Sequence, residues 1–292
     1  MKKIGIVTDS HSSLSPAAAK ELGVHVLPMP FRIDGADYLE GVNLTREEFF
    51  AHQRAGAEIG TSQPAPADVL ALWDELLQEY ETLLYMPISS GLSGSCQTAM
   101  GLAEEEPYLG RVVVVDNGRV ATPLHQSILD ALELIEKGLT AAQCKEALEA
   151  ARDELTIYIA VQTLEYLKKG GRISAATAAV GTILNIKPIL QLTTGKLESY
   201  KKARGMVKAR EIMLESIRSD LAIRFAEAQS RGDVHLLAAG SASPEETAKW
   251  IAQIEAAFPG MPVLYDDLSL GVSCHTGEGA LGVGLSVRPR IK

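Results

Sequence analysis

The sequence predicts an α/β protein of two domains, each built from a β-sheet and helices. In the first half of the 292 residues, apolar runs that suit buried strands alternate with amphipathic segments, which is typical of a parallel sheet with flanking helices. In the second half, some strand candidates follow one another through turns, which favours a mixed or antiparallel sheet with helices. We therefore expect an N-terminal domain over residues 1–155 and a C-terminal domain over residues 156–292.

Strand signals recur along the N-terminal half. KIGIVTDS (3–10), VHVLPMPFRI (24–33), TLLYMPI (82–88) and RVVVVD (111–116) are expected strands, the second interrupted by Pro28 and Pro30. Helix starts are expected at Thr45 with Glu48, at Thr122 with Pro123, and at Thr140 with Gln143. The clearest amphipathic helix covers residues 69–80, with one face formed by Val69, Leu72, Trp73, Leu76 and Tyr80.

The C-terminal half continues with a strand at TIYIAVQ (156–162) and a short helix at TLEYLKKGG (163–171) that ends at glycine. Residues 186–205 are expected as two strands around Gly195, followed by a helix over 206–225. Ser243, Pro244 and Glu246 begin another helix. The remaining strands are DVHLLAAG (233–240), PVLYDDLS (262–269) and ALGVGLSV (280–287).

Composition excludes several classes of protein. The net charge of −9 argues against a nucleic-acid partner, since phosphate binding needs a basic surface. The three cysteines, Cys96, Cys144 and Cys274, are odd in number and not closely spaced, which argues against a disulfide framework or a cysteine-rich zinc site and fits a reducing cytoplasm. No apolar run approaches the ~18 residues of a membrane span, although transient membrane contact stays open.

Four polar clusters follow apolar segments: TDSHSS (8–13), GTSQPAP (60–66), SSGLSGS (89–95) and SCHTGEG (273–279). Ligands of open α/β sheets bind at the carboxyl ends of strands, and glycines let backbone N–H groups approach an anion. SSGLSGS therefore suits an anion site at a strand-to-helix turn. The alternative is that Ser93 and Ser95 only cap the helix.

Known catalytic and nucleotide-binding motifs do not fit. GLSGS lacks the final glycine of a nucleophile elbow, and too few residues follow GEGALG (277–282) for a dinucleotide-binding crossover. There is no Walker-type phosphate loop. A serine hydrolase on Ser93 and His275 stays open, but no acidic partner is evident, and Cys274 is better explained as a packed side chain.

The clusters together resemble the DegV family, whose characterised members are FakB-type fatty-acid-binding proteins. The resemblance rests on seven motifs in order from residue 8 to residue 284: TDS, TSQPAP, SSGLSGS, LEYLKKGGRIS, IKPIL, KARG and HTGEGALGVG. It implies two α/β domains with one long-chain fatty acid between them. It also implies a binding subunit, without cofactor, metal or catalytic residues, that presents the acid to a separate fatty-acid kinase for acyl-phosphate formation in phospholipid synthesis.

The resemblance also implies site residues. The carboxylate is expected to be bound by Thr61, Ser62, Ser93 and His275, with Gly94, Thr276 and Gly277 beside them. Arg172 and Arg204 are expected to contact the kinase or the phosphoryl group. They belong to two basic stretches that suit an acidic partner or, alternatively, form an ordinary solvated surface: Lys168, Lys169, Arg172, Lys201, Lys202, Arg204 and Lys208.

Two departures from the family pattern bear on the ligand. Glu278 replaces the usual proline after HTG and would repel a carboxylate if it pointed inward. After the VVD strand, Pro123 and His125 stand where the family has small residues, which would alter the acyl tunnel. The alternatives to lipid delivery are a stand-alone serine-dependent acyl hydrolase or transferase and a lipid-sensing regulatory protein.

Overall fold

The computed structural model describes residues 2–173, 185–193 and 196–291. Its contacts divide the chain into two compact units. The first unit contains the residues up to Arg152, the short segment Ser269–Gly271 and the C-terminal residues from Pro289. The second contains Asp153–Leu268 and Val272–Arg288. A single domain boundary near residue 155 stays a proposal, because two C-terminal pieces of chain pack with the first unit.

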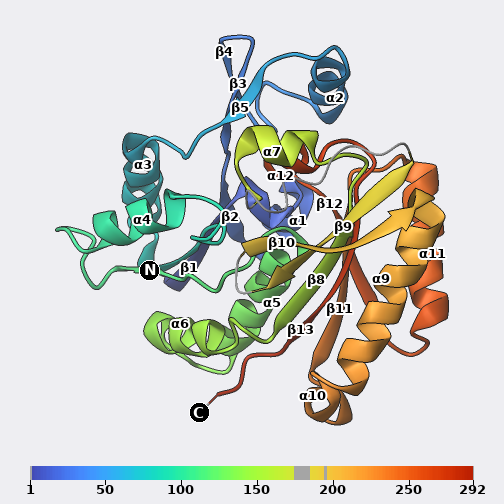
Figure 1. Cartoon of the computed structure of the whole chain (residues 1–292). Coiled ribbons are helices and arrows are strands. Elements are labelled where there is room, and N and C mark those ends of the chain that lie inside the picture. The colour runs from blue at the N-terminus through green and yellow to red at the C-terminus, as the bar shows by residue number, and fades with distance from the viewer. Residues whose placement is uncertain (1, 174–184, 194–195, 292) are drawn as a thin grey trace. The chain divides into compact units, whose positions relative to one another are not determined.

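The first unit is built on a fully parallel sheet, as the sequence predicts (Figure 1). Its strands are buried apolar runs, and each ends in polar residues or a loop. The penultimate residue of the first strand illustrates the register: Thr8 lies beside Val26 on one side and Met86 on the other. In spatial order the strands are β2 (Val24–Leu27), β1 (Lys2–Asp9), β6 (Tyr80–Met86) and β7 (Val112–Val114).

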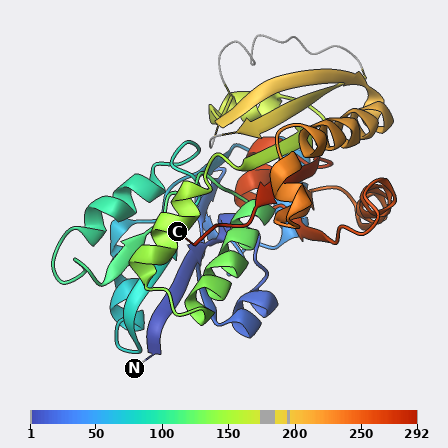
Figure 2. The ribbon, with the colours of Figure 1, turned by 90° about the horizontal axis from the view of Figure 1, so that it is seen from below.

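Helices cover both faces of this sheet, because neighbouring strand residues point to opposite sides. Ile6 and Leu84 face one core cluster, and Val7 and Leu83 face the other. Figure 2 shows helices on both sides of β1 and β6. The first cluster is covered by α1 (Pro16–Leu22), α5 (Thr122–Glu136) and α6 (Ala141–Ala150), the second by α3 (Pro66–Leu76) and α4 (Ser95–Ala103).

A small antiparallel sheet and a helix extend the first unit. The predicted strand over residues 24–33 is two strands in two sheets, because Pro28 and Pro30 cannot donate ladder hydrogen bonds. The small sheet has the order β4 (Ala36–Leu39), β3 (Pro30–Ile33) and β5 (Ile59–Thr61). The helix α2 (Arg46–Arg54) begins with the predicted capping box of Thr45 and Glu48.

The second unit contains a six-stranded mixed sheet, as predicted. All its neighbouring strands are antiparallel except β11 and β12. Gly195, the predicted turn between β9 and β10, lies outside the described residues. In spatial order the strands are β10 (Lys196–Arg204), β9 (Ile186–Thr193), β8 (Leu155–Ala160), β13 (Leu281–Val287), β11 (Val234–Gly240) and β12 (Val263–Asp267).

Two long helices pack on this sheet around a core that includes Trp250, Met213 and Ile217. They are α9 (Gly205–Ala222) and α11 (Pro244–Ala257), which Figure 1 shows along the sheet. As predicted, Ser243 caps α11 by accepting a hydrogen bond from the backbone of Glu246. Among the described residues, the shorter helices are α7 (Glu165–Gly170), α10 (Ala226–Ser230) and α12 (Leu270–Thr276), whose first two residues belong to the first unit.

Three local predictions are wrong. Tyr80 begins β6 instead of extending the helical face of α3, which ends at Leu76. Thr122 is the first residue of α5, and the preceding Ala121 provides no side-chain cap. The helix α12, within the polar cluster around His275, has no counterpart among the predicted elements. The first two errors concern element ends, where tertiary contacts decide between competing local signals.

Candidate functional site

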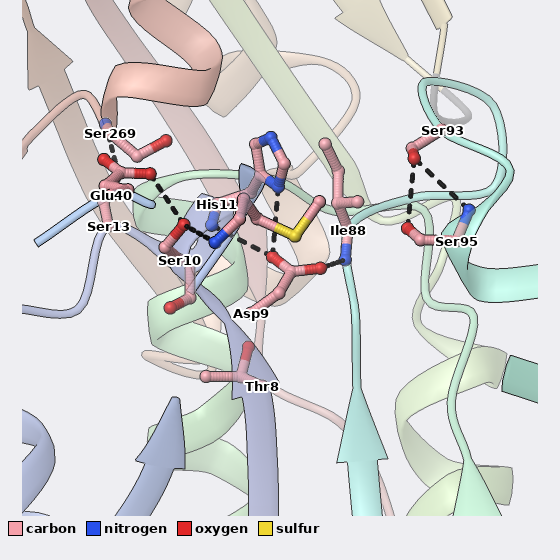
Figure 3. Close-up of polar contacts among 12 residues, drawn as sticks. Thr8, Asp9, Ser10, His11, Ser13, Glu40, Ile88, Ser93, Ser95 and Ser269 are labelled. Carbon is pink, nitrogen blue, oxygen red and sulfur yellow. Dashed lines mark hydrogen bonds and ion pairs between the residues drawn. The ribbon is translucent and has the colours of Figure 1, made fainter. Parts of the chain in front are cut away.

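Asp9 organises the carboxyl ends of the two central parallel strands (Figure 3). It is the last residue of β1 and is fully buried. One carboxylate oxygen accepts the backbone N–H of His11, and the other accepts that of Ile88, each at 2.9 Å. The Nδ1 atom of His11 lies 3.3 Å from the first oxygen. Asp9 thereby connects the chain after β1 to the chain that leads from β6 into the SSGLSGS cluster.

The SSGLSGS hydroxyls have different local roles. Ser89 accepts the backbone N–H of Gly91 at 3.1 Å, which closes a tight turn. Ser90 donates to Asp116 at 2.5 Å. The Ser93 hydroxyl lies 3.0 Å from that of Ser95 and accepts the Ser95 backbone N–H at 3.3 Å, just before α4 begins. Ser93 therefore takes part in the start of the helix, and the residue is partly exposed there.

Asp116 lies next to this turn in the first unit. Burial acts to raise its pKa, but hydrogen bonds from Ser90 and the guanidinium of Arg152 outweigh burial and hold the pKa below its usual value. The ionised carboxylate is therefore the stable form near neutral pH, and it orders the first half of the SSGLSGS turn.

The TSQ segment lies at the N-terminal end of α4, where the SSGLSGS cluster ends. Thr61 ends β5, and the backbone N–H of Ser62 donates to Pro30 at 3.4 Å. The side-chain oxygen of Gln63 accepts the Thr98 hydroxyl of α4 at 3.1 Å. The same oxygen lies 3.4 Å from the place that a Cβ on Gly94 would occupy. Two clusters that are 30 residues apart in the sequence are thus neighbours within the first unit.

In the second unit, His275 packs against Gly170, the first glycine of KKGGR. His275 lies in the last turn of α12 and is partly buried. A Cβ on Gly170 would lie 2.0 Å from Nδ1 of His275, so only glycine leaves room for this imidazole. Arg172 donates to the carbonyl of Gly170. The KGGR and HTG motifs therefore form one local structure.

The residues after His275 form a tight turn. Thr276 donates its hydroxyl to the carbonyl of Val272 at 3.2 Å, so this hydroxyl is bonded within α12. Gly277 has a positive φ of 78°, and its carbonyl accepts the Ser241 hydroxyl at 2.6 Å. Glu278 is exposed.

Arg204 is the last residue of β10 and is exposed, as are Lys201 and Lys202. Arg172 and Arg204 both belong to the second unit, with His275, Thr276 and Gly277. Thr61, Ser62, Ser93 and Gly94 belong to the first.

The thiol beside His275 is poorly suited to nucleophilic chemistry. Cys274 is buried, and burial raises the pKa of its thiol to about 11. The thiolate is the nucleophilic form of cysteine, so a group with this pKa is almost wholly protonated at neutral pH. This agrees with the interpretation of Cys274 as a packed side chain.

Among the residues that the structure describes, no cluster of three or more His, Cys, Asp or Glu side chains is arranged to hold a metal ion. In the same part of the chain, none of the helices combines the length and the apolar character that crossing a membrane requires.

The sequence-based reasoning missed Glu40, whose carboxylate joins two of the polar segments of the first unit (Figure 3). It accepts the Ser10 hydroxyl at 2.6 Å and the backbone N–H of Leu270. A single glutamate in a loop has no local pattern that distinguishes it from a solvated side chain, so only the fold could reveal this role.

The family model described as "Uncharacterised protein, DegV family" matches residues 3–288 of the chain. This chain belongs to the DegV family. A DegV domain-containing protein of Deinococcus radiodurans is 33% identical over 285 residues, which cover 97% of this chain and 98% of that protein. The resemblance inferred from the seven motifs is therefore confirmed.

Two solved structures of DegV family proteins have the same fold. A fatty-acid-binding DegV family protein from Thermus thermophilus has a TM-score of 0.85 and 35% identity, covering 98% of this chain and 99% of that one. A fatty-acid-binding DegV family protein from Streptococcus agalactiae has a TM-score of 0.85 and 27% identity, covering 99% of this chain and 100% of that one. The likeness thus extends over both units.

Proposed function

We propose that this protein binds a long-chain fatty acid and presents its carboxylate to a separate kinase protein that forms the acyl phosphate. The observation that carries the proposal is the full-length likeness to fatty-acid-binding DegV family proteins at 35% and 27% identity. The proposed carboxylate ligands are Thr61, Ser62, Ser93 and His275, with Gly94, Thr276 and Gly277 beside them. The protein itself is proposed to carry no catalytic residue and no cofactor, and to act in the cytoplasm.

The chemistry of the first-unit residues supports this assignment. A hydroxyl both donates and accepts, so Ser93 can keep the Ser95 backbone N–H as a donor to its oxygen while its own proton turns to a carboxylate. Neutral donors stabilise the anion less than a bidentate arginine would. The carboxylate therefore stays nucleophilic toward a phosphoryl donor.

The acyl tail accounts for most of the affinity in this proposal. Transfer of a methylene from water contributes about 0.8 kcal/mol, so a palmitoyl chain contributes roughly 12 kcal/mol before the costs of association. The head-group residues mainly orient the acid and avoid a buried charge without partners. Glu278 is exposed, which supports a carboxylate site that this side chain does not enter.

Replacing Ser93 with alanine is expected to weaken palmitate binding about fivefold to thirtyfold, because one hydrogen bond to a charged group contributes about 1–2 kcal/mol. Affinity is measured by equilibrium competition on delipidated protein, after mass spectrometry of the extract from denatured wild-type protein has identified its lipid. Ser230→Ala is the control, since this exposed serine donates its hydroxyl to the carbonyl of Glu227, away from the SSGLSGS cluster. Unchanged palmitate affinity in Ser93→Ala would show that Ser93 does not bind the carboxylate. If the wild-type protein contained no lipid and bound no fatty acid, the proposed function itself would be contradicted.

Arg172→Ala and Arg204→Ala are expected to reduce acyl-phosphate formation about tenfold, with palmitate content unchanged, if these side chains meet the kinase or the phosphoryl group. The assay combines lipid-loaded protein, a purified bacterial fatty-acid kinase and ATP. Arg231→Ala serves as the control, because this arginine pairs with Glu227 and Asp233. Loss of lipid and of phosphorylation together would instead indicate damaged folding, and no acyl phosphate from the wild type would restrict the function to lipid binding.

A further inference from the structure

The carboxylate of Glu40 holds the chain at the beginning of α12. Glu40 directly follows β4 and is partly buried, whereas Leu39 and Val42 nearby in the sequence are exposed. One of its oxygens accepts the Ser10 hydroxyl at 2.6 Å, and the other accepts the backbone N–H of Leu270. Ser10 in turn accepts the backbone N–H of Met29 at 3.2 Å. Figure 3 shows the contact between Glu40 and Ser10, which come from separate parts of the chain.

Two further contacts hold the same segment. The hydroxyl of Ser13 accepts the backbone N–H of Ser269 at 3.2 Å. Gly271 lies directly against His11, since a Cβ at this glycine would be 2.4 Å from Nε2 of the imidazole. The TDSHSS cluster and Glu40 together therefore fix residues 269–271 within the first unit.

Burying the Glu40 carboxylate away from water costs free energy. Burial raises the pKa of Glu40, and hydrogen bonds from the Ser10 hydroxyl and from the backbone of Leu270 and Gly271 act in the opposite direction. The hydrogen bonds of these groups and the electrostatic interaction with His11 offset part of the desolvation of this carboxylate, and its pKa stays above the usual value. An ordinary surface glutamate would make no such set of contacts.

The helix that Glu40 fastens also carries the proposed head-group ligand. The first turn of α12 contains Leu270 and Gly271, which belong to the first unit, and its last turn contains His275, which belongs to the second. We propose that Glu40 is a positioning residue, which fixes the start of α12 and thereby places His275 for the fatty-acid carboxylate. This inference rests on the proposed fatty-acid binding.

The test is a double-variant cycle on the full-length, delipidated protein, with palmitate and methyl palmitate as probes. Glu40→Ala is expected to weaken palmitate binding about tenfold, and His275→Ala by at least as much. If Glu40 acts through His275, the double variant should bind no more weakly than His275→Ala alone. Methyl palmitate lacks the charged head group, so its affinity should change less than twofold in Glu40→Ala.

Two further variants separate positioning from folding. Glu40→Gln keeps the shape of the side chain and one acceptor oxygen, so its palmitate affinity should lie between that of the wild type and that of Glu40→Ala. Glu48→Ala removes another carboxylate that accepts a backbone N–H, in the exposed capping box of α2, and should leave palmitate affinity unchanged.

The outcomes distinguish this inference from the function on which it rests. Failure of the wild type to bind palmitate would contradict the function itself. If the wild type binds palmitate normally, three results would overturn the positioning role alone. These are additive losses of affinity in Glu40→Ala and His275→Ala, no effect of Glu40→Ala, or a loss of methyl palmitate affinity in Glu40→Ala as large as that of palmitate.

Discussion

Gly170→Ala is expected to reduce palmitate affinity about tenfold to a hundredfold while leaving the protein folded. The added Cβ would lie 2.0 Å from Nδ1 and 2.5 Å from Cε1 of His275, so the imidazole must move. Loss of a well-placed donor to a carboxylate costs about 1.5–3 kcal/mol, which corresponds to this range of affinities. The measurement is equilibrium binding of palmitate, with thermal unfolding as the check of folding.

Gly101→Ala is the matched control, because this glycine also lies in a helix and a Cβ there meets nothing within 4 Å. It should leave affinity unchanged and stabilise the protein by about 0.5–1 kcal/mol, through the higher helix propensity of alanine. Wild-type affinity in Gly170→Ala would show that the position of His275 does not matter for the ligand. Combining Gly170→Ala with His275→Ala should add no further loss.

Asp9→Ala should lower the free energy of unfolding by about 3–5 kcal/mol. The change leaves the backbone N–H groups of His11 and Ile88 without their carboxylate acceptor at a fully buried position, and each unpaired group costs about 1–3 kcal/mol. Asp9→Asn retains one acceptor oxygen, so its free energy of unfolding should fall by roughly half as much as that of Asp9→Ala. Urea unfolding followed by circular dichroism measures the difference.

The control for Asp9 is Asp37→Ala, which removes an exposed carboxylate paired with Arg32. A surface ion pair of this kind contributes about 0–1 kcal/mol, so stability should hardly change. Similar urea midpoints for Asp9→Ala and the wild type would mean that water replaces the carboxylate. In that case Asp9 would not determine the geometry at the carboxyl ends of β1 and β6.

Much of the fold was predictable because its signals are local. The apolar runs of β1, β6, β8, β11 and β13 and the capping box of α2 lie where the sequence predicts them. The errors occurred where neighbouring signals compete. Tyr80 continues the helical spacing of α3, but its ring is buried beside β1, where it packs over Gly5.

The candidate site was predictable only in part. The motifs identified the polar clusters and their order, and the structure shows that Gln63 reaches α4 and that Gly170 accommodates His275. These contacts join residues that are 35 and 105 positions apart, so no local pattern encodes them. Glu40 and Gly271 escaped notice for the same reason, since one is an ordinary loop glutamate and the other an ordinary glycine.

The amino-acid sequence by itself determined the α/β class, most strands and helices, the family and the polar motifs. Periodicity, capping and turn residues act over a few positions and can therefore be read in order along the chain. Only the tertiary structure decided that Asp9 connects two strand ends and that Glu40 bonds the start of α12. It also decided that the imidazole of His275 occupies the space left by the absent side chain of Gly170. Hydrogen-bond partners and van der Waals exclusion depend on distances in space, which the order of residues does not specify.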